Sequence, residues 1–140
     1  MKITRILLTL PLLFLSAATA VHAEPANMKG SPRYEDLAVT LLTPYITKEI
    51  NQYYSKTLKN PPHFAPYYGT RISIESPSKE PNAFLVTVHV VPYIGAHVTV
   101  GEDDITFTVN PSGEVSTTQY THTKDYKLPP SLADQYIGKQ

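Results

Sequence analysis

Apolar residues recur at steps of three and four along residues 34–54, which is the spacing of one face of an α-helix. Just before this stretch, Ser31 offers an N-cap oxygen, and Pro32 suits the first position of a helix. Pro44 lies inside the pattern and has no backbone N–H, so the helix is expected to bend there. Because the apolar stripe keeps its phase on both sides of Pro44, we predict one bent helix rather than two.

After a proline-rich loop over residues 60–69, the apolar period changes to two, which is typical of β-strands. The strands predicted from this alternation are residues 71–75, 84–91, 98–100, 105–109 and 115–121. Asn-Pro-Ser-Gly at residues 110–113 is a turn signal between the last two of them. A helix followed by short antiparallel strands is the α+β pattern. We therefore predict a long, Pro-kinked N-terminal helix packed on a four- to five-stranded antiparallel meander sheet.

The first 23 residues have the pattern of a cleavable signal peptide. Lys2 and Arg5 precede an apolar run over residues 6–15, and Val-His-Ala at residues 21–23 fits the small-x-small cleavage pattern. This run is too short for a spanning helix, which needs about 20 apolar residues. We predict cleavage near Ala23, secretion, and no stable membrane insertion after cleavage. The predicted organisation is 1–23 signal peptide, 24–32 flexible leader, 33–123 single α+β domain and 124–140 polar C-terminal tail.

The composition narrows the possible classes of function. The chain has no Cys, which excludes a thiol nucleophile, a thiolate zinc site and disulfide bonds. It carries 12 basic and 12 acidic residues without a basic cluster. This composition argues against nucleic-acid binding, since phosphate contacts dominate that affinity. No motif indicates a cofactor, and the predicted partner is an extracellular or cell-wall ligand or protein.

The aromatic loop is the most suggestive binding element of the sequence. Phe64, Tyr67 and Tyr68 lie among prolines that stiffen the chain, and exposed aromatic residues are favoured contacts at interfaces. We predict that these three residues and His97 bind a wall sugar, a peptide or a protein. The alternative is that the aromatic rings only cap the core at the end of the helix.

Three histidines on or near the predicted strands, His89, His97 and His122, are candidate metal ligands, because three His with an open position suit zinc. Their spacing matches no familiar ligand motif, so we expect structural histidines. Residues 102–104, Glu-Asp-Asp, offer paired carboxylates for acid–base chemistry or calcium, but are expected to form a charged turn. Ser112, the one candidate for a serine nucleophile on a sharp turn, is better explained by the hairpin.

Two segments resemble a known family. Leu-Leu-Thr-Pro-Tyr-Ile at residues 41–46 is similar to that family's helix, and Tyr-Ile-Gly-Ala-His at residues 93–97 with Ile-Thr-Phe at residues 105–107 is similar to its strand region. The family comprises small Gram-positive exported proteins and is catalogued as domain of unknown function 3888. The resemblance covers residues 34–115; it implies export and the α+β fold, and it carries no mechanism.

The sequence thus predicts a secreted, cysteine-free module that binds a ligand or partner outside the membrane and is not an enzyme. A small extracellular hydrolase or metal-dependent enzyme that uses the strand histidines is the alternative. A structural accessory protein without any ligand is a third possibility.

Overall fold

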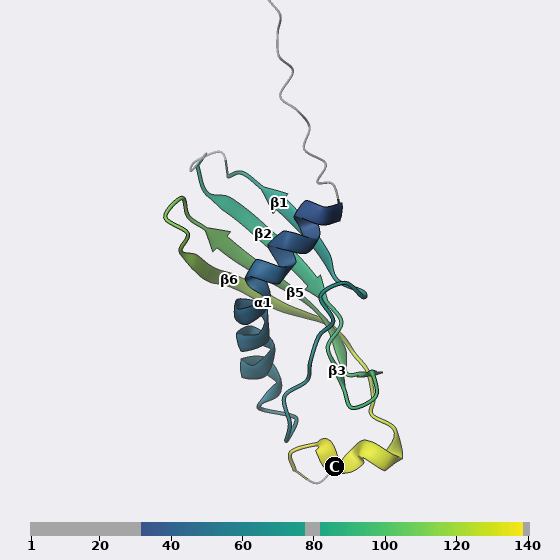
Figure 1. Ribbon diagram of the computed structural model, residues 1–140. Helices are drawn as coiled ribbons and strands as arrows, with labels where there is room; N and C mark the ends of the chain where they lie inside the picture. Colours follow the sequence, from purple (N-terminus) through teal and green to yellow (C-terminus); the bar gives the residue numbers. More distant parts are fainter. Residues whose placement is uncertain (1–31, 78–81, 139–140) are drawn as a thin grey trace, which may run out of the picture.

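The computed structural model describes residues 32–77 and 82–138 of the chain (Figure 1). Its elements are α1 (Pro32–Tyr54), β1 (Arg71–Glu75), β2 (Phe84–Val90), β3 (Tyr93–Ile94), β4 (Val98–Thr99), β5 (Gly101–Val109), β6 (Val115–Asp125) and the 3₁₀ helix η1 (Pro130–Gln135). Within these residues, one antiparallel sheet has the order β1-β2-β5-β6, and β3 pairs with β4 in a separate hairpin. The predicted α+β class is confirmed.

Helix α1 continues through Pro44 as one element, as predicted. Pro44 cannot donate to the carbonyl of Thr40, and the Thr43 hydroxyl donates to the Val39 carbonyl at 2.9 Å. Such back-bonding by threonine bends helices. The axis changes direction near its middle (Figure 1). The bend lets the C-terminal half of the helix follow the twisted sheet.

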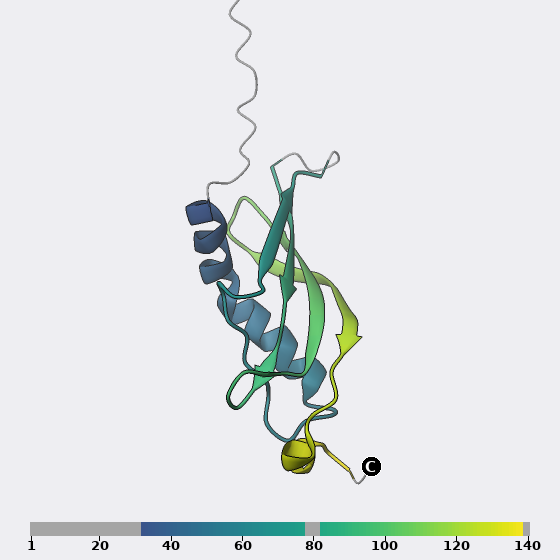
Figure 2. The ribbon, with the colours of Figure 1, turned by 90° about the vertical axis from the view of Figure 1, so that its right-hand side faces the viewer.

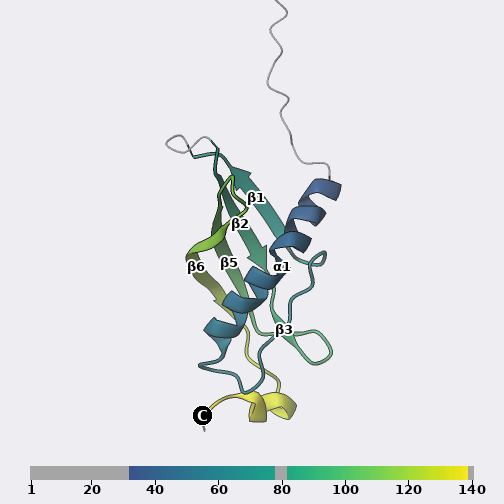
Figure 3. The same cartoon turned by 60° about the vertical axis from the view of Figure 1, so that its left-hand side comes forward.

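The helix covers one face of the sheet and leaves the other face open (Figure 2). It crosses the strands diagonally (Figure 3). Side chains from the second half of α1 and from the facing side of β2 and β5 form most of the core. The buried cluster comprises Leu42, Ile46, Ile50, Tyr54, Leu58, Val86, Val88, Val90, Ile94, Val100, Ile105 and Phe107. The alternation predicted for β2 and β5 therefore marks the face that meets the helix.

The first half of α1 is packed much less closely. Leu41 is 67% exposed, and Ile74 and Phe84 across from it are also about half exposed. Between them lies an apolar groove of about 490 Å³. Its lining residues are Ala38, Leu41, Leu42, Tyr45, Ile74, Phe84, Val86, Val109, Gly113 and Val115. The apolar stripe is thus continuous in sequence, but in its first half only Val39 and Leu42 are buried and Leu41 remains largely exposed.

The segment that follows β6 differs from the predicted polar tail. Leu58 and Tyr136 form an isolated antiparallel bridge, and the Ile137 N–H donates to the Thr57 carbonyl at 2.9 Å. Leu128, Leu132 and Tyr136 pack against the core. These spaced apolar residues, and the 3₁₀ turn that begins at Pro130, fold the segment back onto the end of α1. The domain therefore continues past residue 123.

The predicted signal peptide and most of the predicted leader lie outside the described residues. Among residues 32–77 and 82–138, no helix is both long enough and apolar enough to cross a bilayer. The predicted secretion and cleavage site therefore remain predictions.

Candidate functional site

The acidic run at residues 102–104 is part of β5 and does not form the expected turn. Its neighbours on β6 are set by a register shift between Glu102 and Asp103, which pairs Asp103 with His122. A β-bulge of this kind re-aims side chains. Here it places Asp103 and His122 side by side on the face that meets α1, while Asp104 projects to the open face with His89.

Asp103 is fully buried, and its two carboxylate oxygens each accept a hydrogen bond. The Tyr54 hydroxyl donates to Oδ2 at 3.1 Å, and His122 Nδ1 lies 2.6 Å from Oδ1. The ring of Tyr53 stacks on both Tyr120 and His122, with centroids 4.9 and 5.1 Å apart. A buried charge is tolerated when it is paired and hydrogen-bonded, which is the case here. These five residues are called the polar network below.

The second ring nitrogen of His122 also faces a carboxylate. His122 Nε2 lies 2.9 Å from Asp125 Oδ1, but the contact is not aligned as a hydrogen bond. Burial opposes the charged form of His122, but the close contacts with the carboxylates of Asp103 and Asp125 outweigh it and raise the pKa of the ring. Burial raises the pKa of Asp103, although the hydrogen bonds that it accepts oppose this shift. Both shifts favour the protonated form of the group concerned.

Gly101 makes room for the polar network. A Cβ at this position would collide with the Tyr54 hydroxyl and would lie 2.8 Å from Cε1 of His122. Only glycine lets the strand pass this close to both rings. Gly101 also pairs with Asp125 across the sheet, and this pairing fixes the position of Asp125 beside the polar network.

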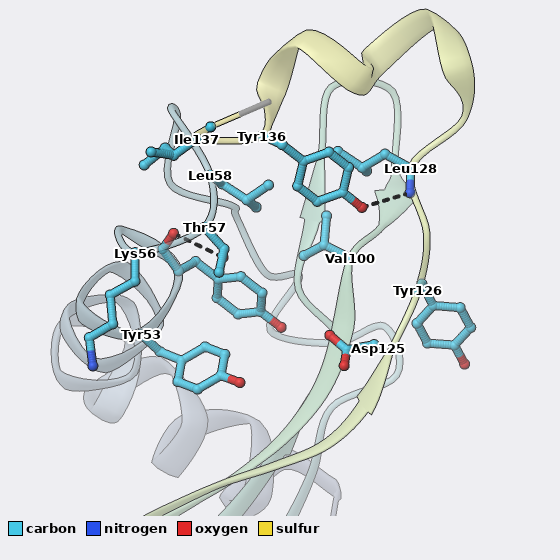
Figure 4. Close-up of a pocket in the computed structure, with 12 residues that line it drawn as sticks. Tyr53, Lys56, Thr57, Leu58, Val100, Asp125, Tyr126, Leu128, Tyr136 and Ile137 are labelled. Atoms are coloured by element: carbon cyan, nitrogen blue, oxygen red, sulfur yellow. Dashed lines mark hydrogen bonds between the residues drawn. The ribbon is translucent and has the colours of Figure 1, made fainter. Parts of the chain in front are cut away.

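A cavity of about 320 Å³ adjoins the polar network at the C-terminal end of α1 (Figure 4). It is lined by Tyr53, Tyr54, Lys56, Thr57, Leu58, Val100, Asp125, Tyr126, Leu128, Tyr136, Ile137 and Gly138. Its far wall is the returned C-terminal segment, where the Leu128 N–H donates to the Tyr136 hydroxyl at 3.1 Å. The cavity has the size of a small-ligand site and a lining of rings with a few polar groups.

The predicted binding residues lie in three environments. Tyr67 and Tyr68 are 67% and 80% exposed, and the Tyr67 hydroxyl lies 2.8 Å from the Thr40 hydroxyl of α1. Phe64 is partly buried and packs against the core. His97 is exposed on the β3–β4 hairpin with a left-handed φ of 62°, and its ring packs on Tyr93 at 4.4 Å. Tyr67 and Tyr68 therefore form the exposed part of the loop, whereas His97 contacts Tyr93.

The three candidate metal ligands are not brought together. His89 lies on the open face of the sheet with Nδ1 2.8 Å from Asp104 Oδ1, and His122 lies on the opposite face. His97 belongs to the separate β3–β4 hairpin region. Across the described residues, no group of three or more His, Cys, Asp or Glu side chains is arranged to hold a metal ion.

Sequence reasoning missed the polar network and the cavity. Asp103 has the same alternation as Ile105 and Phe107, so the period of β5 extended backwards would have placed it on the buried face. No sequence pattern indicated that Asp103 would pair with His122, because that pairing depends on the β-bulge. No pattern indicated the cavity either, because it depends on a contact between residues 57 and 137, which are far apart in the sequence.

Comparison with known proteins agrees with the family resemblance. No curated protein and no solved structure gives a match to the chain. The family model described as protein of unknown function (DUF3888) matches residues 34–124, which is more than half of the chain and spans α1 and almost the whole sheet. The chain belongs to this family of proteins of unknown function.

Proposed function

We propose that the protein is an exported, non-enzymatic binding module that acts outside the membrane and takes its ligand in the cavity at the end of α1. One observation carries this proposal: a mixed aromatic and polar cavity of about 320 Å³ lies directly beside a buried polar network. Pockets of this size, with convergent polar groups and titratable residues of shifted pKa, are the usual location of a ligand site.

Binding is favoured over catalysis because the titratable groups of the polar network are already engaged. Nδ1 of His122 is paired with Asp103, and Nε2 is buried where it faces Asp125, so neither ring nitrogen is open to a substrate. Burial and the neighbouring Asp103 raise the pKa of the Tyr54 hydroxyl, which therefore stays protonated. A general base must lie within hydrogen-bond distance of the proton that it removes and must have an available lone pair. The network supports a cavity wall of fixed shape.

Tyr67 and Tyr68 support a second contact surface, suited to a cell-wall polymer or a protein. Both rings are largely exposed, and the loop that carries them is held at both ends. His63 exchanges two backbone hydrogen bonds of 2.8 Å with Tyr93, and Tyr67 reaches Thr40 on α1. Rigid, exposed tyrosines lose little entropy on contact, which favours them at interfaces.

Export rests on the leader of the sequence and has a direct test. Mass spectrometry of the protein recovered outside the producing cell should give a mature chain that begins at Glu24. A chain that keeps Met1 and stays inside the cell would contradict export and would leave the binding proposal untouched.

The binding proposal is tested by thermal unfolding of the purified chain against wall fragments, short peptides, divalent metals and a chelator. A ligand at 100 times its dissociation constant stabilises the fold by about 2.7 kcal/mol, which raises Tm by several degrees. Ile137→Trp, which adds bulk at a half-exposed position of the cavity wall, should abolish the shift.

The matched control is the double variant Tyr67→Ala and Tyr68→Ala, which leaves the cavity intact. A shift lost in this variant and kept in Ile137→Trp would assign the ligand to the loop. If no member of the panel shifts Tm, the proposal of a small-ligand cavity is wrong.

A further inference from the structure

Asp125 is an accessible acidic group in the lining of the cavity. It is the last residue of β6, and its side chain is 92% exposed. Its Oδ1 faces His122 Nε2 at 2.9 Å, and its second oxygen, Oδ2, is open to a donor from solution. Asp103, in contrast, has a donor on each oxygen and no exposure. Asp125 therefore offers a ligand an accessible carboxylate oxygen.

Aromatic rings stand beside this carboxylate. Tyr53 and Tyr54 meet at 79° with centroids 4.9 Å apart, so they form two walls at nearly a right angle. Figure 4 shows the Tyr53 ring extending from the helix toward Asp125. The electron-rich face of a tyrosine attracts cations, and a nearby carboxylate adds to this attraction.

The rim of the cavity already holds one cation in this way. The Lys124 ammonium lies 4.5 Å from the centre of the Tyr126 ring and 3.5 Å from Glu102 Oε1. Tyr126 also lines the cavity. A tyrosine ring paired with a carboxylate is therefore an arrangement in which this surface accommodates an ammonium group.

The cavity's own lysine does not neutralise Asp125. Lys56 belongs to the lining, but its ammonium lies on the far side of Tyr53 from Asp125 (Figure 4). Among the ion pairs of the described residues, Asp125 is matched with His122 and not with Lys56. Because His122 faces Oδ1 of Asp125, Oδ2 is the carboxylate oxygen left for a cation that comes from solution.

We infer that the cavity binds an organic ammonium group, with Asp125 as the counterion and the tyrosine rings as the walls. This inference rests on the proposed function, because it names the ligand class of the same cavity. A sugar amine, a peptide amino group and a quaternary ammonium all carry the chemistry that it requires.

The test is isothermal titration of the whole purified chain with choline and with its uncharged carbon analogue, in which carbon replaces the quaternary nitrogen. Choline should bind at least about tenfold more tightly than the analogue, because only choline carries the charge. Asp125→Asn should weaken choline binding by about tenfold and leave the analogue unchanged. Asp125→Glu, which keeps the charge, should retain most of the affinity.

The matched control is Asp134→Asn, which removes an exposed carboxylate of η1 outside the cavity and should not change choline binding. Equal binding of choline and its analogue, or full affinity in Asp125→Asn, would overturn the inference. Absence of choline binding would also overturn it. The proposed function would survive that result if another ligand still shifts Tm and Ile137→Trp abolishes the shift.

Discussion

The two halves of α1 bury their apolar side chains to different extents. Ile46 and Ile50, in the second half, are almost completely buried against the sheet. In the first half Val39 and Leu42 are buried, but Leu41, which also belongs to the apolar stripe, is two-thirds exposed above an apolar groove. The sequence of the two halves has the same apolar spacing. The difference teaches that periodicity fixes which face of a helix turns inward, while the elements opposite decide how much of that face is buried.

The second half also carries the polar groups. Tyr53 and Tyr54 lie where the helix meets Asp103, His122 and the cavity, so the half of α1 that buries Ile46 and Ile50 also contacts a buried charge. The first half has a looser apolar contact and no buried charged residue among its neighbours in the groove. The buried polar groups that α1 contacts are thus concentrated at its C-terminal end.

The largest expected effect compares Ile50→Ala with Leu41→Ala. Ile50 is 1% exposed, so its truncation should lower the free energy of unfolding by about 2–5 kcal/mol. Leu41→Ala should change it by less than about 0.5 kcal/mol. Urea denaturation of both variants measures the difference. Equal losses would mean that the groove is closed in solution.

The next effect separates two adjacent acids. Asp103→Ala leaves the Tyr54 hydroxyl and His122 Nδ1 without their partner, and should cost about 3 kcal/mol. Asp104→Ala removes a more exposed partner of His89 and should cost less than about 1 kcal/mol. The same denaturation measurement applies, and a cost for Asp104→Ala as large as that for Asp103→Ala would refute the assignment of the two faces.

The pair of His122 and Asp103 should make the stability of the protein depend on pH. The folded-state pKa of His122 is raised above 6.5, so its contribution to stability is complete below pH 6.5 and is lost as pH rises through the folded value. The raised pKa of Asp103 acts in the same direction. The free energy of unfolding of the protein and of His122→Gln is to be measured from about pH 5 to about pH 9. The difference between the two should shrink as pH rises. A difference that grows with pH would contradict the geometry of the pair.

The smallest expected effect concerns the contact between the aromatic loop and the first half of α1. Tyr67→Phe removes the hydroxyl that meets Thr40 at 2.8 Å on an exposed surface. The free energy of unfolding should fall by less than about 0.5 kcal/mol, a Tm change below about 4 °C. Tyr68→Phe, whose side chain is still more exposed, is the matched control for scanning calorimetry. A larger loss in Tyr67→Phe would show that the loop holds the helix in place.

The helix, the hairpin and the fold class followed from the sequence because they depend on local rules. Periods of 3.6 and 2 mark helix and strands, and the Asn-Pro-Ser-Gly turn sets the β5–β6 hairpin, where Gly113 has a φ of 83°. Pro44 was correctly predicted to bend the helix without dividing it, because the apolar phase on both sides was visible in the sequence.

The polar network and the return of the C-terminal segment depend on contacts between distant residues. Three consecutive acids have the composition of an exposed turn, and only the pairing of Asp103 with His122 shows that one of them is buried. The segment after Asp125 has the composition of a polar tail, and its few apolar residues become informative only once Leu58 is opposite Tyr136. Neither pairing is encoded by a local pattern.

The bridge between Leu58 and Tyr136 has a consequence for the order in which the molecule is completed. A chain is synthesised from its N-terminus, so α1 and the sheet residues exist before Tyr136 and Ile137 are added. The far wall of the cavity is therefore synthesised after the core of the domain. A nascent chain can form its hydrophobic core before the pocket is complete, and deletion of residues 128–138 would remove this wall while leaving the sheet.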